Sequence, residues 1–259
     1  MQAIVDADIL CYRIAFACKD QPVGVACRTL DNYIADILVR GVDKAYDGCF
    51  VGSWSMHLTG KGNFREAIAT TAVYKGNRLD TPKPEHHAAL RQHLIETWSA
   101  QIAEGQEADD AIAIEATTLF DDCVIVSLDK DLDQVAGWHY NFVKDIAYFI
   151  RPDEGLLRFY CQILMGDAAD NIKGITGIGP VTARKMLEDA EGETDMYQRC
   201  VDAYEGNEDR VIENARLLWL RRTKDEPLWM PPKSNPTTLP SSSDPTPKKA
   251  KRSKAPLKS

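Results

Sequence analysis

The stretch CVIVSLDKDLD, residues 123–133, gives the clearest indication of the fold class. Its first half is apolar and β-branched, which predicts a buried strand over residues 123–128. Two acids, Asp129 and Asp131, follow at the carboxyl end of that strand. Similar apolar runs predict strands over residues 2–6, 49–54 and 138–143. Because segments with helical spacing separate these runs, we expect an α/β fold with a parallel, doubly wound sheet.

Helical patterns fill much of the remaining chain. Apolar residues at helical spacing and capping residues predict helices over residues 8–19, 31–45, 84–103 and 107–120, and a mainly helical region from residue 156 to residue 220. The chain therefore divides into an α/β core over residues 1–150 and a helical subdomain over residues 151–230. Residues 231–259 are rich in Pro, Ser, Thr and Lys and poor in large apolar residues, which predicts a disordered basic tail.

Composition limits the class of protein. The 259 residues are 44% apolar and 27% charged, which is typical of a soluble globular protein long enough to bury a core. No apolar run approaches the roughly 18 residues that a membrane span needs, and the first ten residues lack a basic leader, so we expect no membrane partner and a cytoplasmic location. Seven scattered cysteines without a C-x-x-C pair favour reduced core thiols over a zinc site.

Charge is unevenly distributed along the chain. The net charge is −8, but the tail from Pro231 carries seven Lys and Arg against the single acid Asp244. The tail can attract phosphates, and its basic run also resembles a nuclear localisation signal, which is the alternative to a cytoplasmic location. The preceding residues are therefore strongly acidic, unlike a general nucleic-acid binder. The acidic residues of this part of the chain are either solvated at the protein surface or gathered around a cation.

Carboxylates gather in four separate places. Asp6 and Asp129 end two predicted strands, at the sheet edge where ligands bind. Glu107 and Asp110 are three residues apart and share a helix face, whereas Asp109 points elsewhere in a regular helix. Hard divalent ions, Mg²⁺ or Mn²⁺, would offset the repulsion of these acids, and no His or Cys accompanies them. Two such ions serve phosphoryl chemistry, which indicates a nuclease-type phosphodiesterase. The full set is Asp6, Glu107, Asp109, Asp110, Asp129, Asp131, Asp167 and Asp170.

A glycine-rich loop, NIKGITGIGP over residues 171–180, is the second motif. Its glycines permit a tight turn and close approach to a phosphate, and the next helix, starting near Pro180, offers free N–H groups to an anion. This form grips the DNA backbone without reading bases, although a plain helix–turn–helix connector is the alternative. The residues that we expect to contact DNA here are Lys173, Gly174, Gly177, Gly179, Arg184 and Lys185.

A basic segment with aromatic residues is the third motif, GKGNFREAIATTAVYKGNR at residues 60–78. Beside an acidic metal cluster it offers a place for the scissile phosphate and for an unpaired base, with Phe64 and Tyr74 as stacking surfaces. Taken alone, it could be any basic surface loop. Its expected DNA contacts are Lys61, Arg65, Tyr74, Lys75 and Arg78.

Together these residues resemble the flap endonuclease and bacteriophage 5′-exonuclease family, over about residues 1–190. The motifs stand in the family's order: IVDAD, VYKGNR, EADD, SLDKD and GDAADNIKGITGIGP. The resemblance implies a PIN-like sheet flanked by helices, an arch over about residues 74–106 and a C-terminal helix–hairpin–helix subdomain that clamps DNA. It also implies a bacteriophage replication or recombination setting.

The resemblance further implies roles for individual residues. Two divalent ions would be held by the eight carboxylates, and Lys75, Asp110 and Asp129 would carry catalysis. Tyr74 would stack on a base, and a monovalent cation, K⁺, would bind at the 174–179 loop. The partner would be branched or 5′-ended duplex DNA, with an RNA–DNA hybrid as a further substrate and a monomer as the acting form. One departure is Thr59, which stands where the family usually carries another acid.

The expected function is therefore a metal-dependent 5′-nuclease, acting as a 5′-3′ exonuclease and flap endonuclease on DNA. Two alternatives stay open at this point. One is a structure-specific DNA-binding protein whose catalysis has weakened through the change at Thr59. The other is a PIN-type ribonuclease, although such domains are generally shorter and lack the glycine-rich hairpin.

Overall fold

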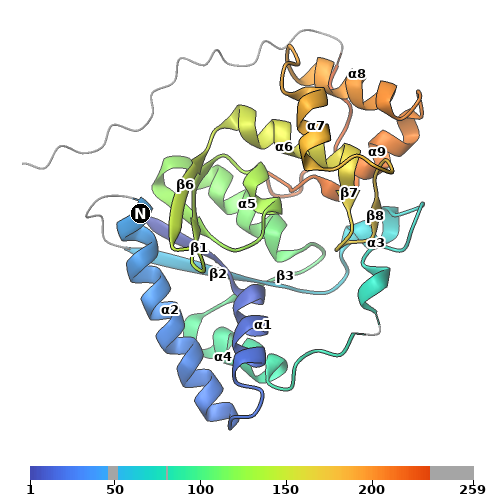
Figure 1. Ribbon diagram of the computed structural model, residues 1–259. Helices are drawn as coiled ribbons and strands as arrows, with labels where there is room; N and C mark the ends of the chain where they lie inside the picture. The colour runs from blue at the N-terminus through green and yellow to red at the C-terminus, as the bar shows by residue number, and fades with distance from the viewer. Residues whose placement is uncertain (46–51, 80, 234–259) are drawn as a thin grey trace, which may run out of the picture.

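The computed structural model describes residues 1–45, 52–79 and 81–233 (Figure 1). Within these residues a six-stranded sheet has the order β3-β2-β1-β4-β5-β6, and the β1, β2, β3, β4 and β5 pairings are parallel. The predicted α/β fold is confirmed, but β6 pairs antiparallel with β5, so the sheet is mixed. The strands are β1 (Gln2–Asp6), β2 (Ser53–Thr59), β3 (Gln101–Ala103), β4 (Cys123–Val126), β5 (Gly137–Asn141) and β6 (Ile146–Ile150).

The central strand β1 is buried on both faces, and its side chains alternate between two cores. Ala3 and Val5 pack with α1 (Ala7–Ala17), α2 (Val23–Ala45) and α4 (His87–Trp98), whereas Ile4 packs with α5 (Ala108–Leu119). Successive side chains of a strand point to opposite faces, so one short apolar run contributes to both cores. Helices on both faces leave the carboxyl edge of the sheet free for a site.

The C-terminal part of the chain is mainly helical and has its own core, built around Phe159 and Ile163 (Figure 1, yellow to orange). Its elements are α6 (Pro152–Met165), the two-stranded β7 (Gly166–Asp167) and β8 (Ile172–Lys173), α7 (Pro180–Leu187), α8 (Glu193–Ala203) and α9 (Glu208–Leu218). The short helix α3 (Phe64–Ile68) contacts α9. Single 3₁₀ turns are η1 (Gly76–Arg78), η2 (Phe120–Asp122) and η3 (Asp131–Gln134).

Two predicted elements differ from the structure. The helix predicted over residues 84–103 ends at Trp98, because Ser99 adopts a left-handed conformation with φ +56°, and residues 101–103 then form β3. The strand predicted over residues 49–54 instead runs from Ser53 to Thr59. Polar residues interrupt the apolar pattern of this strand, so a search for apolar runs does not detect it. Residues 49–51 and most of the predicted tail, residues 234–259, lie outside the described residues. No described helix is long and apolar enough for a membrane span.

Candidate active site

Two of the predicted acids meet at the carboxyl edge of the sheet. Asp6 ends β1, and its Oδ1 accepts a hydrogen bond from the N–H of Ile9, which caps α1. Ser127, just after β4, donates its hydroxyl to Asp6 Oδ2 at 2.7 Å, and the same hydroxyl oxygen accepts the N–H of Asp129 at 2.9 Å. Because β1 and β4 are parallel neighbours, the two strand ends place Asp6 and Asp129 side by side, as predicted.

The amino end of α5 brings Asp109 to the same place. Burial raises the pKa of Asp109, and the charges of Asp6, Asp129 and Glu107 raise it further. Asp109 also lines the small cavity that Asp131 and Asp170 line, and this corrects the expectation that it points elsewhere. The reason is that Glu107 is the N-cap of α5 with extended backbone, so the acids do not share one regular helical face.

Asp131, Asp167 and Asp170 complete the cluster from the other side. Burial, followed by the charges of Asp129, Asp167 and Asp170, raises the pKa of Asp131 to about 7. Its Oδ1 accepts a hydrogen bond of 2.6 Å from the side-chain amide of Gln162 on α6. A small cavity lies among these groups, lined by Arg65, Tyr74, Glu107, Asp109, Asp131, Asp170 and three leucines.

Lys75 pairs with two of the acids that line this cavity. Its Nζ pairs with Glu107 and lies 3.7 Å from Asp170 Oδ1, and Arg78 lies 3.2 Å from the same oxygen. Burial lowers the pKa of Lys75, but Glu107 and Asp170 outweigh it and the net shift is upward, so the ammonium stays charged. Its backbone is held in a left-handed conformation, φ +53°, with its N–H donated to the carbonyl of Asp170.

The other acids of this cluster have no cationic partner among the described residues. In the described part of the chain, Asp6, Asp109, Asp129, Asp131 and Asp167 form no ion pair, whereas Glu107 and Asp170 do. Among these residues no set of three or more His, Cys, Asp or Glu side chains is already gathered closely enough to hold a metal ion. The donor set nevertheless fits a hard cation, because it consists of carboxylate oxygens that repel one another and resist ionisation.

Asp110 does not join this cluster. It is 0% exposed, and its oxygens accept hydrogen bonds of 2.6 and 2.9 Å from the guanidinium of Arg65, which is 1% exposed. Arg65 also donates to the carbonyls of Leu217 and Trp219. The structure therefore corrects two predictions: Asp110 is the partner of a buried arginine rather than a metal ligand, and Arg65 is too deeply buried to contact DNA.

Tyr74 is also buried, at 6% exposure, and its hydroxyl donates to Asp170 at 2.7 Å and lies 3.0 Å from Glu107 Oε2. This corrects the prediction that its ring stacks on a base. Several of the other predicted DNA contacts, unlike Tyr74 and Arg65, lie at the surface. Exposed among them are Lys61, Arg78, Lys173, Arg184 and Lys185.

The glycine-rich loop joins β8 to α7, and Pro180 occupies the first turn of α7 as predicted. Gly177 has φ +86°, which only glycine adopts readily, and Gly179 is the N-cap of α7. Gly174 is constrained differently, because a Cβ there would lie 2.0 Å from the carbonyl carbon of Met165. Its close approach is thus to the protein's own backbone.

Thr59 ends β2 and lies beside the amino end of α5. Its Oγ1 accepts the N–H of Ala108 at 3.0 Å, and its own N–H donates to Asp8 Oδ2 at 2.7 Å. Asp8 is in turn paired with Arg91 of α4 at 3.0 Å. A carboxylate therefore reaches the end of β2 even though residue 59 is neutral.

Two residues that support the site were missed by the sequence analysis. Ser127 bridges Asp6 and Asp129, and its place two residues before Asp129 at a strand end was an available signal. Gln162 holds Asp131, but it is one polar residue in an ordinary helix, so nothing local distinguishes it.

Comparison with known proteins identifies relatives of the chain. It is 28% identical over 193 residues to flap endonuclease Xni of Shewanella sediminis, covering 69% of each protein. It is 34% identical over 130 residues to flap endonuclease Xni of Shewanella baltica, covering 49% of that protein. The chain is thus similar in sequence to proteins named flap endonuclease. DNA polymerase I of Rhizobium leguminosarum is 35% identical over 174 residues, but the chain spans only 16% of that polymerase.

Solved structures show the same fold. The crystal structure of the T5 D15 protein with metal ions matches 84% of this chain and 88% of its own, with a TM-score of 0.61 and 19% identity. The zinc-bound T5 5′-exonuclease matches with a TM-score of 0.60 and 20% identity. No protein-family model matches the chain. The resemblance noted in the sequence is confirmed by these relatives.

Proposed function

We propose that the chain is a divalent-metal-dependent 5′-nuclease that hydrolyses DNA phosphodiesters at 5′ ends, flaps and junctions. The observation that carries the proposal is the convergence of carboxylates from four separate segments beside Lys75 at the carboxyl edge of the sheet. Relatives named flap endonuclease support it, and so does a T5 flap endonuclease crystallised with DNA and metal ions, which has a TM-score of 0.59 to this chain. The T5 likeness also favours a bacteriophage setting.

The acids without a cationic partner are the proposed metal ligands. Asp6, Asp109, Asp129 and Asp131 would bind directly, and Glu107, Asp167 and Asp170 would complete the coordination or orient water. When bound, Mg²⁺ or Mn²⁺ at this place supplies activation of water and stabilisation of the leaving oxygen in phosphodiester hydrolysis. Two ions match the number of acids, because one divalent charge balances only two carboxylates.

Lys75 acts on the substrate phosphate. Its ammonium already lies beside the acids, so an incoming phosphate exchanges places with Glu107 as the partner of that charge. Positive charge there stabilises the extra negative charge that develops as the phosphodiester is cleaved. Tyr74 orients Glu107 and Asp170 through its hydroxyl rather than touching a base.

The helical part of the chain would hold the duplex. The amino end of α7 and the exposed Lys173, Arg184 and Lys185 form a phosphate-binding surface that does not read bases. Carbonyl groups of the 174–179 loop would hold K⁺ there. In this arrangement residues 1–150 form the catalytic core, residues 74–106 the arch and residues 151–230 the clamp.

A cleavage assay tests the proposal. The protein is incubated with a 5′-flap duplex and Mg²⁺ or Mn²⁺, and compared with Asp129→Asn and with the control Asp209→Asn, an exposed acid of α9. We expect wild type and the control to release products with 5′-phosphate and 3′-hydroxyl ends, and Asp129→Asn to be inactive. Equal cleavage by all three proteins would remove Asp129 from the mechanism.

The same assay separates the alternatives. Tight binding of branched DNA without cleavage under any divalent metal would favour a DNA-binding protein with lapsed catalysis. Preference for single-stranded RNA over flap DNA would favour a ribonuclease.

A further inference from the structure

The segment that carries Lys75 has no regular structure before η1. Residues 69–75 connect α3 to η1 and form neither helix nor strand, so their backbone groups need partners from elsewhere in the protein. The position of Lys75 therefore depends on what anchors this segment.

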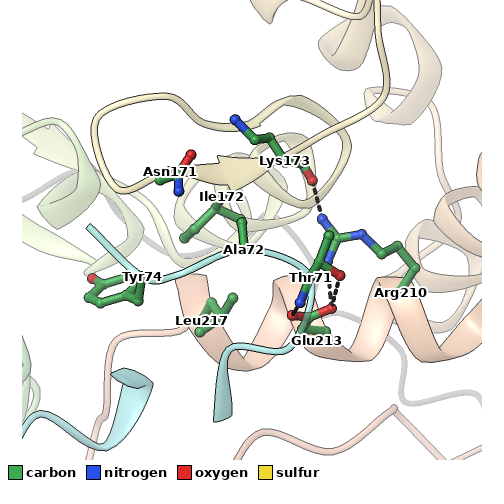
Figure 2. A pocket seen from close by; sticks show the side chains of 9 residues that line it. All are labelled: Thr71, Ala72, Tyr74, Asn171, Ile172, Lys173, Arg210, Glu213 and Leu217. Atoms are coloured by element: carbon green, nitrogen blue, oxygen red, sulfur yellow. Dashed lines mark hydrogen bonds and ion pairs between the residues drawn. The ribbon is translucent and has the colours of Figure 1, made fainter. Parts of the chain in front are cut away.

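One anchor is Glu213 of α9 (Figure 2). Its Oε1 accepts the backbone N–H groups of Thr70 and Thr71, both at 2.7 Å, and its Oε2 accepts the Thr71 hydroxyl at 2.6 Å. Arg210, one turn earlier on α9, donates to the same Oε2 at 2.6 Å. Burial acts to raise the pKa of Glu213, but the hydrogen bonds from Thr71 and Thr70 outweigh it and lower the pKa to about 2. The carboxylate therefore stays ionised at any working pH.

The same helix also fixes the start of the glycine-rich loop. Arg210 donates through its other terminal nitrogen to the carbonyl of Lys173 at 2.6 Å, and Asn214 donates to that carbonyl at 2.9 Å (Figure 2 shows the Arg210 contact). α9 is thus a common support for the segment before Lys75 and for the strand β8 that enters the loop.

The far end of the segment is held by different groups. The Lys75 N–H donates to the carbonyl of Asp170, and the side chain of Asn171 donates to the carbonyl of Val73 at 2.9 Å. Between Glu213 at residues 70–71 and these contacts at residues 73–75, one residue, Ala72, remains. Loss of either anchor therefore leaves the backbone of residues 69–75 held at only one end.

We propose that Glu213 is a positioning residue for Lys75: by clamping Thr70 and Thr71 it fixes the segment that aims the Lys75 ammonium at the acidic cluster. The inference rests on the proposed nuclease function for its consequence in catalysis. The claim that Glu213 holds the segment in place does not rest on that function, because the hydrogen bonds from Thr70 and Thr71 to Glu213 are present whatever the chain does.

The first test measures the segment itself. Amide hydrogen exchange is compared in wild type, Glu213→Ala and the matched control Asp209→Ala, an exposed acid of the same helix. We expect faster exchange in peptides covering residues 69–77 for Glu213→Ala alone. Unchanged exchange there in a folded variant overturns the proposal, whether or not the protein proves to be a nuclease.

The second test measures kcat and KM on a 5′-flap substrate. We expect Glu213→Ala to lower kcat by about 10- to 100-fold with KM little changed, since misplacement of a catalytic group costs that much. Glu213→Gln keeps an oxygen that accepts both N–H groups, so it should recover most of kcat. If Glu213→Ala does not fold, Thr71→Val removes only the hydroxyl contact and should lower kcat by a smaller factor; a full rate in that variant then contradicts the proposal.

A double-mutant cycle with Lys75→Met identifies the route of the effect. If Glu213 acts through Lys75, then Glu213→Ala causes little further loss of kcat in the Lys75→Met background. Equal fractional losses in both backgrounds would show a general structural effect and overturn the proposal. If the wild-type protein does not cleave the flap substrate, the proposed function is refuted instead. The hydrogen-exchange experiment then still decides whether Glu213 holds residues 70–71 in place.

Discussion

Removing the guanidinium of Arg65 tests the correction that the structure makes to the role of Asp110. In Arg65→Met, the Asp110 carboxylate stays fully buried but loses two charge-assisted hydrogen bonds of 2.6 and 2.9 Å. It keeps only the backbone N–H groups of Arg221 at 3.1 Å and Glu107 at 3.2 Å. The carbonyls of Leu217 and Trp219 lose their donor as well.

The expected cost follows from burial. Breaking a buried ion pair by removing one partner destabilises a protein by about 3–5 kcal/mol, which is a large share of the roughly 5–15 kcal/mol that holds a domain together. Burial acts to raise the pKa of Asp110, but Arg65 outweighs it and holds that pKa below its usual value, so the pair is charged in the native state. Without Arg65 the carboxyl should take up a proton on folding.

Urea unfolding followed by circular dichroism measures the change in the free energy of unfolding. Two controls define the interpretation. Arg184→Met removes an exposed pair with Glu188 and should cost less than about 1 kcal/mol. The double variant Arg65→Met/Asp110→Leu should be more stable than Arg65→Met, because no buried charge is left unpaired, and its Mn²⁺ affinity should be that of wild type. A loss below about 1 kcal/mol for Arg65→Met, or a weakened Mn²⁺ site in the double variant, would refute the reasoning.

Two further predictions concern the acids and the glycine-rich loop. Burial, with help from neighbouring acids, raises the pKa of both Asp6 and Asp131 from 3.8 to about 7. The folded state therefore binds protons that the unfolded state has released, so stability of the metal-free protein should fall as pH rises from about 4 to 7, and the urea midpoint should be lower at pH 8 than at pH 5.5. Mg²⁺ should raise that midpoint at pH 8 and have little effect at pH 5.5; the opposite order would show that these acids are not strained by mutual repulsion. Gly174→Ala should lower the melting temperature strongly or prevent folding, because its Cβ would lie 2.0 Å from the Met165 carbonyl carbon, whereas Gly179→Ala meets nothing within 4 Å and should melt like wild type. Similar melting of the two variants would contradict the packing at Gly174.

The sequence was sufficient for the parts of the fold that repeat a simple pattern. The apolar run of β4 and the acid that follows it predicted where the candidate site meets the sheet. Pro180 predicted the start of α7. The edge strand β6 was not predicted, since a five-residue segment after a turn has too little pattern to reveal antiparallel pairing. The end of α4 depended on one left-handed serine, which no composition argument detects.

The candidate site was predictable in its residue types but not in its partners. Asp6, Asp129 and Asp131 were candidates from the sequence, because acids at strand ends are visible there. Asp109 was a candidate only through the family resemblance. Tertiary contacts decide which acid is free and which is neutralised. Asp110 is paired with Arg65, 45 residues away, and Glu213 lies more than 140 residues from the segment that it clamps. Such pairings leave no local signal in a single sequence.

Mn²⁺ binding is the measurement that bears most directly on the acidic cluster. Titration calorimetry at pH 7.5 compares wild type with Asp109→Asn and with Asp209→Asn, which changes an exposed acid outside the cluster. We expect wild type and Asp209→Asn to bind Mn²⁺ alike, and Asp109→Asn to bind it at least about tenfold more weakly. Equal affinity in all three proteins, or no binding by wild type, would contradict the proposal that these distant carboxylates form one cation site.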